Sequence, residues 1–361
     1  MQTFLIAVAG VVFGLLVVAA LGVFWLKRKL RGVGKALSAL ASSLTRVSPF
    51  RITLLPLNVA AWRNGDDMIE ASTSLESAGY QRVGDFEVSE MEDVLLRGFW
   101  HPQRLSYAVV YDHPQAGVFA DVVGMYRDRS LLTVSTCPET GMDRHPRSPI
   151  LRMELEGADE FHRLHERLVA ETAGREPIAT APEQFMRAVE GAYWMEMRWR
   201  IQRGGVTADE VRRAAAAGGQ EPPDDCAVEL VQAGWRSAIA AFVEQEVLKA
   251  WLDGNPVPAA EWEEQRERIR GVHDHCDGGD LADELAWSMI AGSCDEEDDA
   301  AEDRAHAEAR SRLAPLFSGS AVAGFAAALE LLPEKRRPRR LGSVAKPFAG
   351  DVYLEPEDEA L

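Results

Sequence analysis

The feature that most constrains this chain is an uninterrupted apolar run from Phe4 to Leu26. Its 23 residues include no charged side chain, no proline and no side-chain amide. A helix of about 20 such residues crosses the hydrocarbon core of a bilayer and satisfies its own backbone hydrogen bonds there. No basic residue precedes the run, and it is longer than the apolar region of a secretory signal. We therefore predict an uncleaved transmembrane anchor over residues 1–26.

Basic side chains follow the apolar run at once and set its direction. The positive-inside rule places the N-terminus outside and the rest of the chain in the cytoplasm, which in a bacterium means a single-pass protein of the inner membrane. The same side chains are suited to contact anionic lipid. This basic collar consists of Lys27, Arg28, Lys29, Arg31 and Lys35.

Two weak patterns near the membrane suggest a homodimer. Gly10 and Gly14 form a GxxxG spacing that lets two membrane helices approach closely. Residues 27–49 carry an apolar stripe at alternating spacings of three and four, which predicts a basic juxtamembrane amphipathic helix. That helix could pair in a coiled coil or lie on the membrane surface. The stripe consists of Leu30, Val33, Leu37, Leu40, Leu44 and Val47.

Composition limits the partners of the body of the chain. The chain has 361 residues and a formal net charge of −18, and its first 51 residues contain seven basic residues and no acidic one. The remainder holds 32 basic and 57 acidic residues. Such an acidic body is unsuited to nucleic acid, because phosphate contacts need a basic face. The partners still expected are proteins and membrane lipid. The cysteines show no paired spacing and are expected to be free thiols in a reducing compartment: Cys137, Cys226, Cys276 and Cys294.

The periodicity predicts an α+β fold behind the anchor. Residues 50–218 form an α+β domain with trailing helices, in which short runs rich in Val, Tyr, Phe and Thr alternate with turn residues, as in antiparallel hairpins. Residues 224–332 are expected to form an all-helical domain, and the Pro- and charge-rich residues 333–361 a disordered tail. The strand predictions are Arg51–Leu57, Tyr80–Val88, Val94–Trp100, Leu105–Tyr111, Gly117–Tyr126, Leu131–Cys137 and Ile150–Leu155.

The densest set of possible metal ligands is His273, His275, Cys276 and Asp277. Imidazole, thiolate and carboxylate groups at such spacing can bind a transition metal. The alternative is ordinary helix chemistry, in which acidic residues cap a helix that starts near Asp280.

A second set could meet at one rim of the sheet. If the strands form a simple meander, His113, Cys137, Asp143 and His145 share one end of it. Such groups could bind a metal or act in acid–base chemistry. The alternative is simpler: each of the three His-Pro dipeptides in this domain marks a turn, and its histidine is only a turn residue.

The sequence contains no phosphate-binding loop, dinucleotide fingerprint, nucleophile elbow or kinase signature, and it identifies no cofactor. Our first hypothesis is therefore a membrane-anchored cytoplasmic scaffold or interaction protein without catalysis. The alternatives are a metal-dependent enzyme that uses one of the two sets above, or a small-molecule sensor whose sheet holds an apolar ligand.

Overall fold

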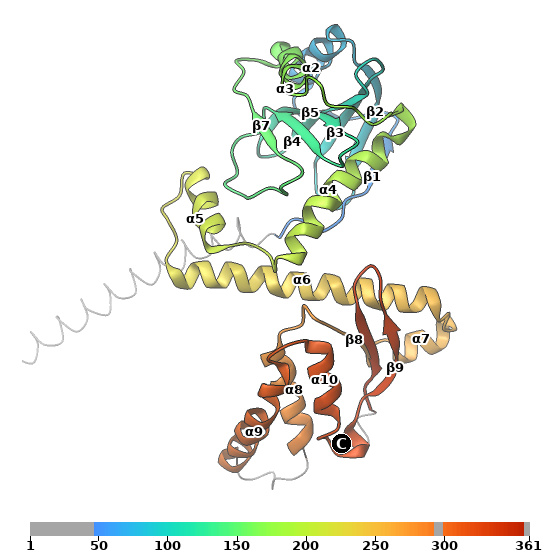
Figure 1. Ribbon diagram of the computed structural model, residues 1–361, viewed down its shortest axis with the longest axis vertical. Helices are drawn as coiled ribbons and strands as arrows, with labels where there is room; N and C mark the ends of the chain where they lie inside the picture. The colour runs from blue at the N-terminus through green and yellow to red at the C-terminus, as the bar shows by residue number, and fades with distance from the viewer. Residues whose placement is uncertain (1–46, 292–298, 357–361) are drawn as a thin grey trace, which may run out of the picture.

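A computed structural model of the chain describes residues 47–291 and 299–356. The predicted anchor, the basic collar and the Gly10/Gly14 seam lie outside the described residues. Figure 1 shows an α+β domain at one end, the long helix α6 (Asp225–Gly254) across the middle, and a smaller unit on the other side of α6.

The α+β domain is built on one seven-stranded sheet whose spatial order follows the chain order. Neighbouring strands are antiparallel except the last pair, which is parallel. The predicted antiparallel α+β domain is thus confirmed in its main features. The strands are β1 (Leu54–Leu57), β2 (Gln81–Val88), β3 (Leu95–His101), β4 (Ser106–His113), β5 (Gly117–Met125), β6 (Leu131–Ser135) and β7 (Ile150–Arg152).

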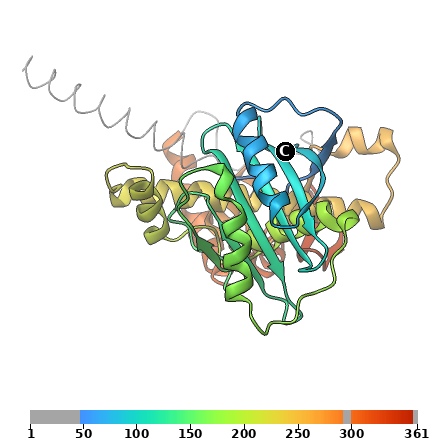
Figure 2. The same ribbon diagram turned by 90° about the horizontal axis from the view of Figure 1, so that it is seen from above.

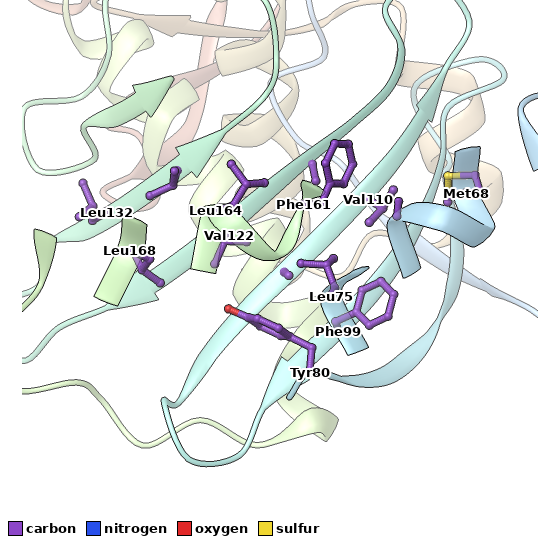
Figure 3. Packing of buried hydrophobic residues seen from close by; sticks show 14 of the residues in the cluster. Met68, Leu75, Tyr80, Phe99, Val110, Val122, Leu132, Phe161, Leu164 and Leu168 are labelled. Carbon is purple, nitrogen blue, oxygen red and sulfur yellow. The ribbon is translucent and has the colours of Figure 1, made fainter. Parts of the chain in front are cut away.

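One face of the sheet is covered by α2 (Gly65–Ser77) and α3 (His162–Glu171), which lie side by side on it (Figure 2). Alternate residues of the strands point toward these helices, as the two-residue period of a strand requires. Figure 3 shows their packing, with Phe99, Val110 and Val122 beneath the helices. All three are fully buried. These side chains and those of the two helices form one buried hydrophobic cluster.

The other face is partly covered by α4 (Phe185–Gln202), which runs from the sheet to α6 (Figure 1). Phe185 is fully buried there against Phe86 and Tyr107. A Cβ atom at Gly98 would lie 2.4 Å from the Phe185 ring, so the glycine in β3 makes room for this side chain. Glycine in a strand commonly marks such a close approach.

Carboxylates of neighbouring helices block two exposed sheet edges. The Leu54 N–H of β1 donates to Glu190 of α4 over 2.9 Å, and Pro56, which faces the same way two residues later, has no N–H to offer. In β8 (Ile269–His273), the Gly271 N–H donates to Glu244 of α6, also over 2.9 Å. Blocked donors of this kind prevent further strands from adding to an edge.

Helix α6 is a shared wall between the two units. Within the described residues it is the one helix long and apolar enough to cross a membrane. Its apolar side chains have packing partners inside the protein: one hydrophobic cluster joins Phe50, Ile201 of α4, Ile239 of α6 and Val352 of the C-terminal unit. Burial against these neighbours accounts for the apolar character of α6.

The C-terminal unit corrects two predictions: it is not all-helical, and residues 339–344 and 350–354 of the predicted disordered tail form strands. A three-stranded antiparallel sheet in the order β8-β10-β9 packs on α6. Strand β8 lies inside a segment predicted as helix, and β9 (Arg339–Val344) and β10 (Gly350–Leu354) lie in the predicted tail. The helices of this unit are α7 (Ala259–Gln265), α8 (Gly278–Ile290), α9 (Asp299–Leu313) and α10 (Ala321–Leu329).

The physical reason is pairing over a long distance in sequence. The register joins Val272 to Asp351, and Val352 and Tyr353 are almost fully buried. Two short apolar runs surrounded by charged residues carry no local signal of a sheet until they meet.

Candidate ligand pocket and its histidine pair

The residues of the predicted metal set in the C-terminal unit form a helix cap and local hydrogen bonds. Asp277 caps α8, since its Oδ1 accepts the N–H groups of Gly279 (2.7 Å) and Asp280 (3.2 Å). The His273 Nδ1 accepts the His275 N–H over 3.2 Å, and the Cys276 sulfur lies 3.7 Å from either ring nitrogen of His273. Burial, together with His275, lowers the pKa of His273 to about 4.

The second predicted set does not converge. The Asp143 carboxylate pairs with Arg203, which follows the end of α4, and with Arg213 of α5 (Ala208–Ala217). The His145 ring packs against Trp199 at 5.9 Å between centroids. Cys137 follows β6, where burial and then Asp121 raise the pKa of its thiol. Across residues 47–291 and 299–356, no group of three His, Cys, Asp or Glu side chains is placed to hold a metal ion.

Asp143 and His145 instead belong to a clamp that fixes loop 136–149 to the helices. The Asp143 N–H donates to Glu210 (2.9 Å) and the His145 N–H to Glu196 (3.0 Å). Arg200, itself buried, bridges Glu210 and the Asp143 carbonyl. Buried charges that are paired and hydrogen-bonded in this way are structural, because removing one partner leaves the other uncompensated.

The three His-Pro dipeptides adopt one shared turn. In each, the histidine Nδ1 accepts backbone N–H groups that follow the proline. His101 accepts from residues 103 and 104 (both 3.2 Å), His113 from residues 115 and 116 (both 3.1 Å), and His145 from residue 147 (3.0 Å). These bonds agree with the alternative in which the histidines are turn residues. Each also requires a Nδ1 that carries no proton.

His101 differs from the other two in its surroundings. It is buried at 6% exposure, and its ring lies parallel to that of His165 with 4.8 Å between centroids. Its Nε2 is 3.1 Å from the Ala78 carbonyl oxygen and donates to it. His165 was not among the site residues predicted from the sequence, because a contact between β3 and α3 has no local signature.

A chain of hydroxyl groups connects this histidine pair to the surface. The Tyr80 hydroxyl lies 3.2 Å from the His165 Nδ1 and 3.0 Å from the Ser106 Oγ. Burial, then His101 and Arg104, lower the pKa of His165 to about 4, and burial raises the pKa of Tyr80. A histidine with so low a pKa is a weak base, so the chain is unsuited to activating Ser106 as a nucleophile.

Ser106 lies in the floor of a pocket of about 340 Å³, which we call the basic pocket. It lies between the β3–β4 turn, the end of β5 and the C-terminal end of α3. The lining includes two arginines and no acidic residue. It consists of Gln103, Arg104, Ser106, Gly124, Tyr126, Leu168, Val169, Thr172, Ala173, Gly174, Arg175 and Pro177.

Both arginines line the basic pocket and are exposed. Arg175 also acts on a neighbouring carboxylate: hydrogen bonds from Ser130, and then the positive charge of Arg175, lower the pKa of Asp128. The Arg175 guanidinium carbon lies 5.4 Å from the centroid of the Tyr126 ring. A Cβ atom at Gly124 would lie 2.1 Å from the Tyr126 hydroxyl, so this glycine lets the ring lie over β5.

A second pocket of about 350 Å³, the acidic pocket, lies at the opposite end of β4. Its charged lining is one arginine, Arg63, with four acidic residues. One of these, Asp112, is 1% exposed and already accepts three hydrogen bonds from Arg63 and Asn64. The acidic residues that line it are Glu87, Glu92, Asp93 and Asp112.

Comparison of the chain with protein-family models, with curated proteins and with solved structures gives no match.

Proposed function

We propose that this chain is a membrane-tethered binding protein whose cytoplasmic α+β domain takes up a small anionic molecule in the basic pocket. One observation carries the proposal: a chain with a net charge of −18 has a pocket lined by two arginines and no acidic residue. The anchor and its orientation come from the sequence alone, through the apolar run and the basic collar.

The donors around the basic pocket suit an anion. Guanidinium groups hold carboxylate, sulfate and phosphate oxygens through paired N–H donors. The Ser106 hydroxyl lines the same pocket, and Leu168 and Pro177 add an apolar wall. The Thr172 hydroxyl is already used, because it donates to the Leu168 carbonyl oxygen over 2.6 Å. A volume of about 340 Å³ suits a small molecule of a few to about fifteen non-hydrogen atoms.

Binding explains the pocket better than catalysis does. His165 reaches Ser106 only through Tyr80, and its pKa of about 4 makes it a poor general base. We therefore expect a bound molecule to dissociate without chemical change. A sensor of this kind acts through a protein partner, which agrees with the interaction role expected from the sequence. Its ligand is polar and binds at the protein surface.

The test is anion binding by the full chain purified in detergent. Isothermal titration with sulfate, inorganic phosphate, succinate and benzoate should find at least one anion that binds. Each of Arg104→Gln and Arg175→Gln should weaken binding by about tenfold, because each removes a charge-assisted contact.

Arg63→Gln, in the acidic pocket, is the matched control and should leave anion binding unchanged. No binding of any anion in this panel, or equal binding by the Arg104→Gln/Arg175→Gln double variant, would contradict the proposal.

A further inference from the structure

The basic pocket depends on a histidine that does not line it. The Arg104 N–H donates to the His101 Nδ1 over 3.2 Å, and so does the Gln103 N–H. The residue that brings a guanidinium to the pocket is therefore held at its backbone by an imidazole. Arg104 itself is exposed, and the turn around it includes Leu105 at a φ of +52°, a conformation that needs support from its neighbours.

Both ring nitrogens of His101 are already in use. The Nε2 carries the proton and donates to the Ala78 carbonyl oxygen, so the Nδ1 is the one position that can take up a second proton. A protonated Nδ1 becomes a donor that faces two other donors. The turn would then lose both of its hydrogen bonds to the imidazole.

The titratable and charged groups that face His101 are a second imidazole, a phenol and a guanidinium. The His165 ring of α3 lies parallel at 4.8 Å, the Tyr80 ring meets it edge-on at 5.0 Å, and Arg104 adds a positive charge from the same turn. Burial lowers the pKa of His101 most, the hydrogen bond to the Ala78 carbonyl oxygen raises it in part, and Arg104 lowers it again. Protonation under acid conditions would thus place a charge in a site with no negative group to balance it.

We propose that His101 makes the basic pocket proton-sensitive: the pocket binds its anion while the imidazole is neutral and releases it when protonation frees the Arg104 turn. This inference rests on the proposed function. The inference predicts that anion affinity falls on acidification. Simple electrostatics predicts the opposite, because an extra positive charge near a fixed pocket would strengthen anion binding. The sign of the pH effect therefore distinguishes gating from plain attraction.

The experiment uses sulfate, which keeps its charge throughout the range, and the full chain in detergent. Titration calorimetry from about pH 7.5 to about pH 4.5 should show affinity falling by about tenfold or more below the ordinary pKa of histidine. Circular dichroism at each pH confirms that the chain is folded. Affinity that is constant or rises on acidification would overturn the gating.

His101→Asn provides the decisive variant, because an asparagine Oδ1 accepts the same two N–H groups in a turn and does not titrate. Its ratio of sulfate affinities at the two pH values should be close to one, and a ratio like that of the wild type would count against the gating. His113→Asn changes the equivalent turn at the other end of β4 and should keep the wild-type ratio. Absence of binding by every anion of the panel would remove the proposed function as well, whereas sulfate binding with a flat pH profile would remove the gating alone.

Discussion

The turns at the two ends of β4 contain the same tripeptide but lie beside pockets of different character. His101-Pro-Gln precedes the strand and His113-Pro-Gln follows it, and in both turns the imidazole Nδ1 accepts two backbone N–H groups. Each turn lies near a pocket of similar volume, about 340 Å³ and about 350 Å³. The pockets carry opposite charge. The local sequence thus determines the conformation of the turn. It does not determine what the neighbouring pocket can bind, and neither does the volume of the pocket.

The difference lies in how the polar groups are used. At the acidic end, Asp112 is fully engaged with Arg63 and Asn64, so its carboxylate organises the start of α2. At the basic end, the pocket lining contains Arg104 and Arg175 and no carboxylate, although Arg175 acts on Asp128 outside the lining. Satisfied polar groups stabilise a fold, and unsatisfied ones at a pocket are available to a ligand.

The largest effect on stability should come from the acidic end. Asp112→Ala removes the acceptor of three hydrogen bonds and leaves buried donors unpaired, so we expect a loss of about 3 kcal/mol in the free energy of unfolding. Urea denaturation of the two proteins measures it. Asp93→Asn is the control in the same pocket. It removes the exposed ion pair with Arg63 and keeps a residue type that tolerates the φ of 61° at this position, so it should cost under about 0.5 kcal/mol. A similar loss in the free energy of unfolding in both variants would contradict the distinction between the buried Asp112 and the exposed Asp93.

A smaller loss is expected in the hydroxyl chain at the basic end. Tyr80→Phe removes the group between Ser106 and His165, at a cost of about 1–2 kcal/mol in stability. Sulfate binding should weaken as well, since Ser106 loses the bond that orients it. Thermal denaturation and sulfate titration measure the two effects. Unchanged sulfate affinity would show that Ser106 takes no part in binding.

The histidine pair should make stability depend on pH. The pKa of His165 is about 4 in the folded chain against about 6.5 in an unfolded one. As the pH falls through this window the unfolded state takes up the proton first, so stability present above about pH 6.5 is lost toward about pH 4.

His165→Phe keeps a ring against His101 and removes the titration. The stability of this variant should fall less on acidification than that of the wild type, while His273, which has a similar pKa, contributes equally to both. Urea denaturation at several pH values measures the difference. Parallel curves for the two proteins would show that His165 has no such role. The effect is moderate because the His165 ring is only partly buried.

The smallest effect is expected at the second His-Pro-Gln turn. His113→Asn retains an acceptor for the two N–H groups, so stability should change by under about 0.5 kcal/mol and sulfate affinity should not change. Denaturation and titration together check this. A clear loss of sulfate binding would mean that the two ends of β4 are coupled.

Most of the sheet could be predicted from the sequence because its pairing is local. Each strand from β1 to β6 pairs with its neighbour in the chain, and turn residues separate them. The parallel β6–β7 pair was missed, since loop 136–149 crosses over before β7. Strand β8 was missed because its partner, β10, lies about eighty residues away and carries no independent signal.

The candidate site could be predicted only in part. The sequence drew attention to the His-Pro dipeptides, and the turns they form agree with the simpler interpretation. It could not indicate the basic pocket, because Arg104 and Arg175 come together only when α3 packs on the sheet. Nor could it reveal which arginines have carboxylates beside them, since this depends on contacts such as those that occupy Arg200 in the clamp.

The most direct test of the account is a crystal structure of the chain grown with selenate, an analogue of sulfate that can be located by anomalous scattering. The account predicts an anomalous peak in the basic pocket, within hydrogen-bond distance of the Arg104 and Arg175 guanidinium groups and near the Ser106 hydroxyl. An empty basic pocket at saturating selenate, or a peak at the acidic end of β4 instead, would contradict it.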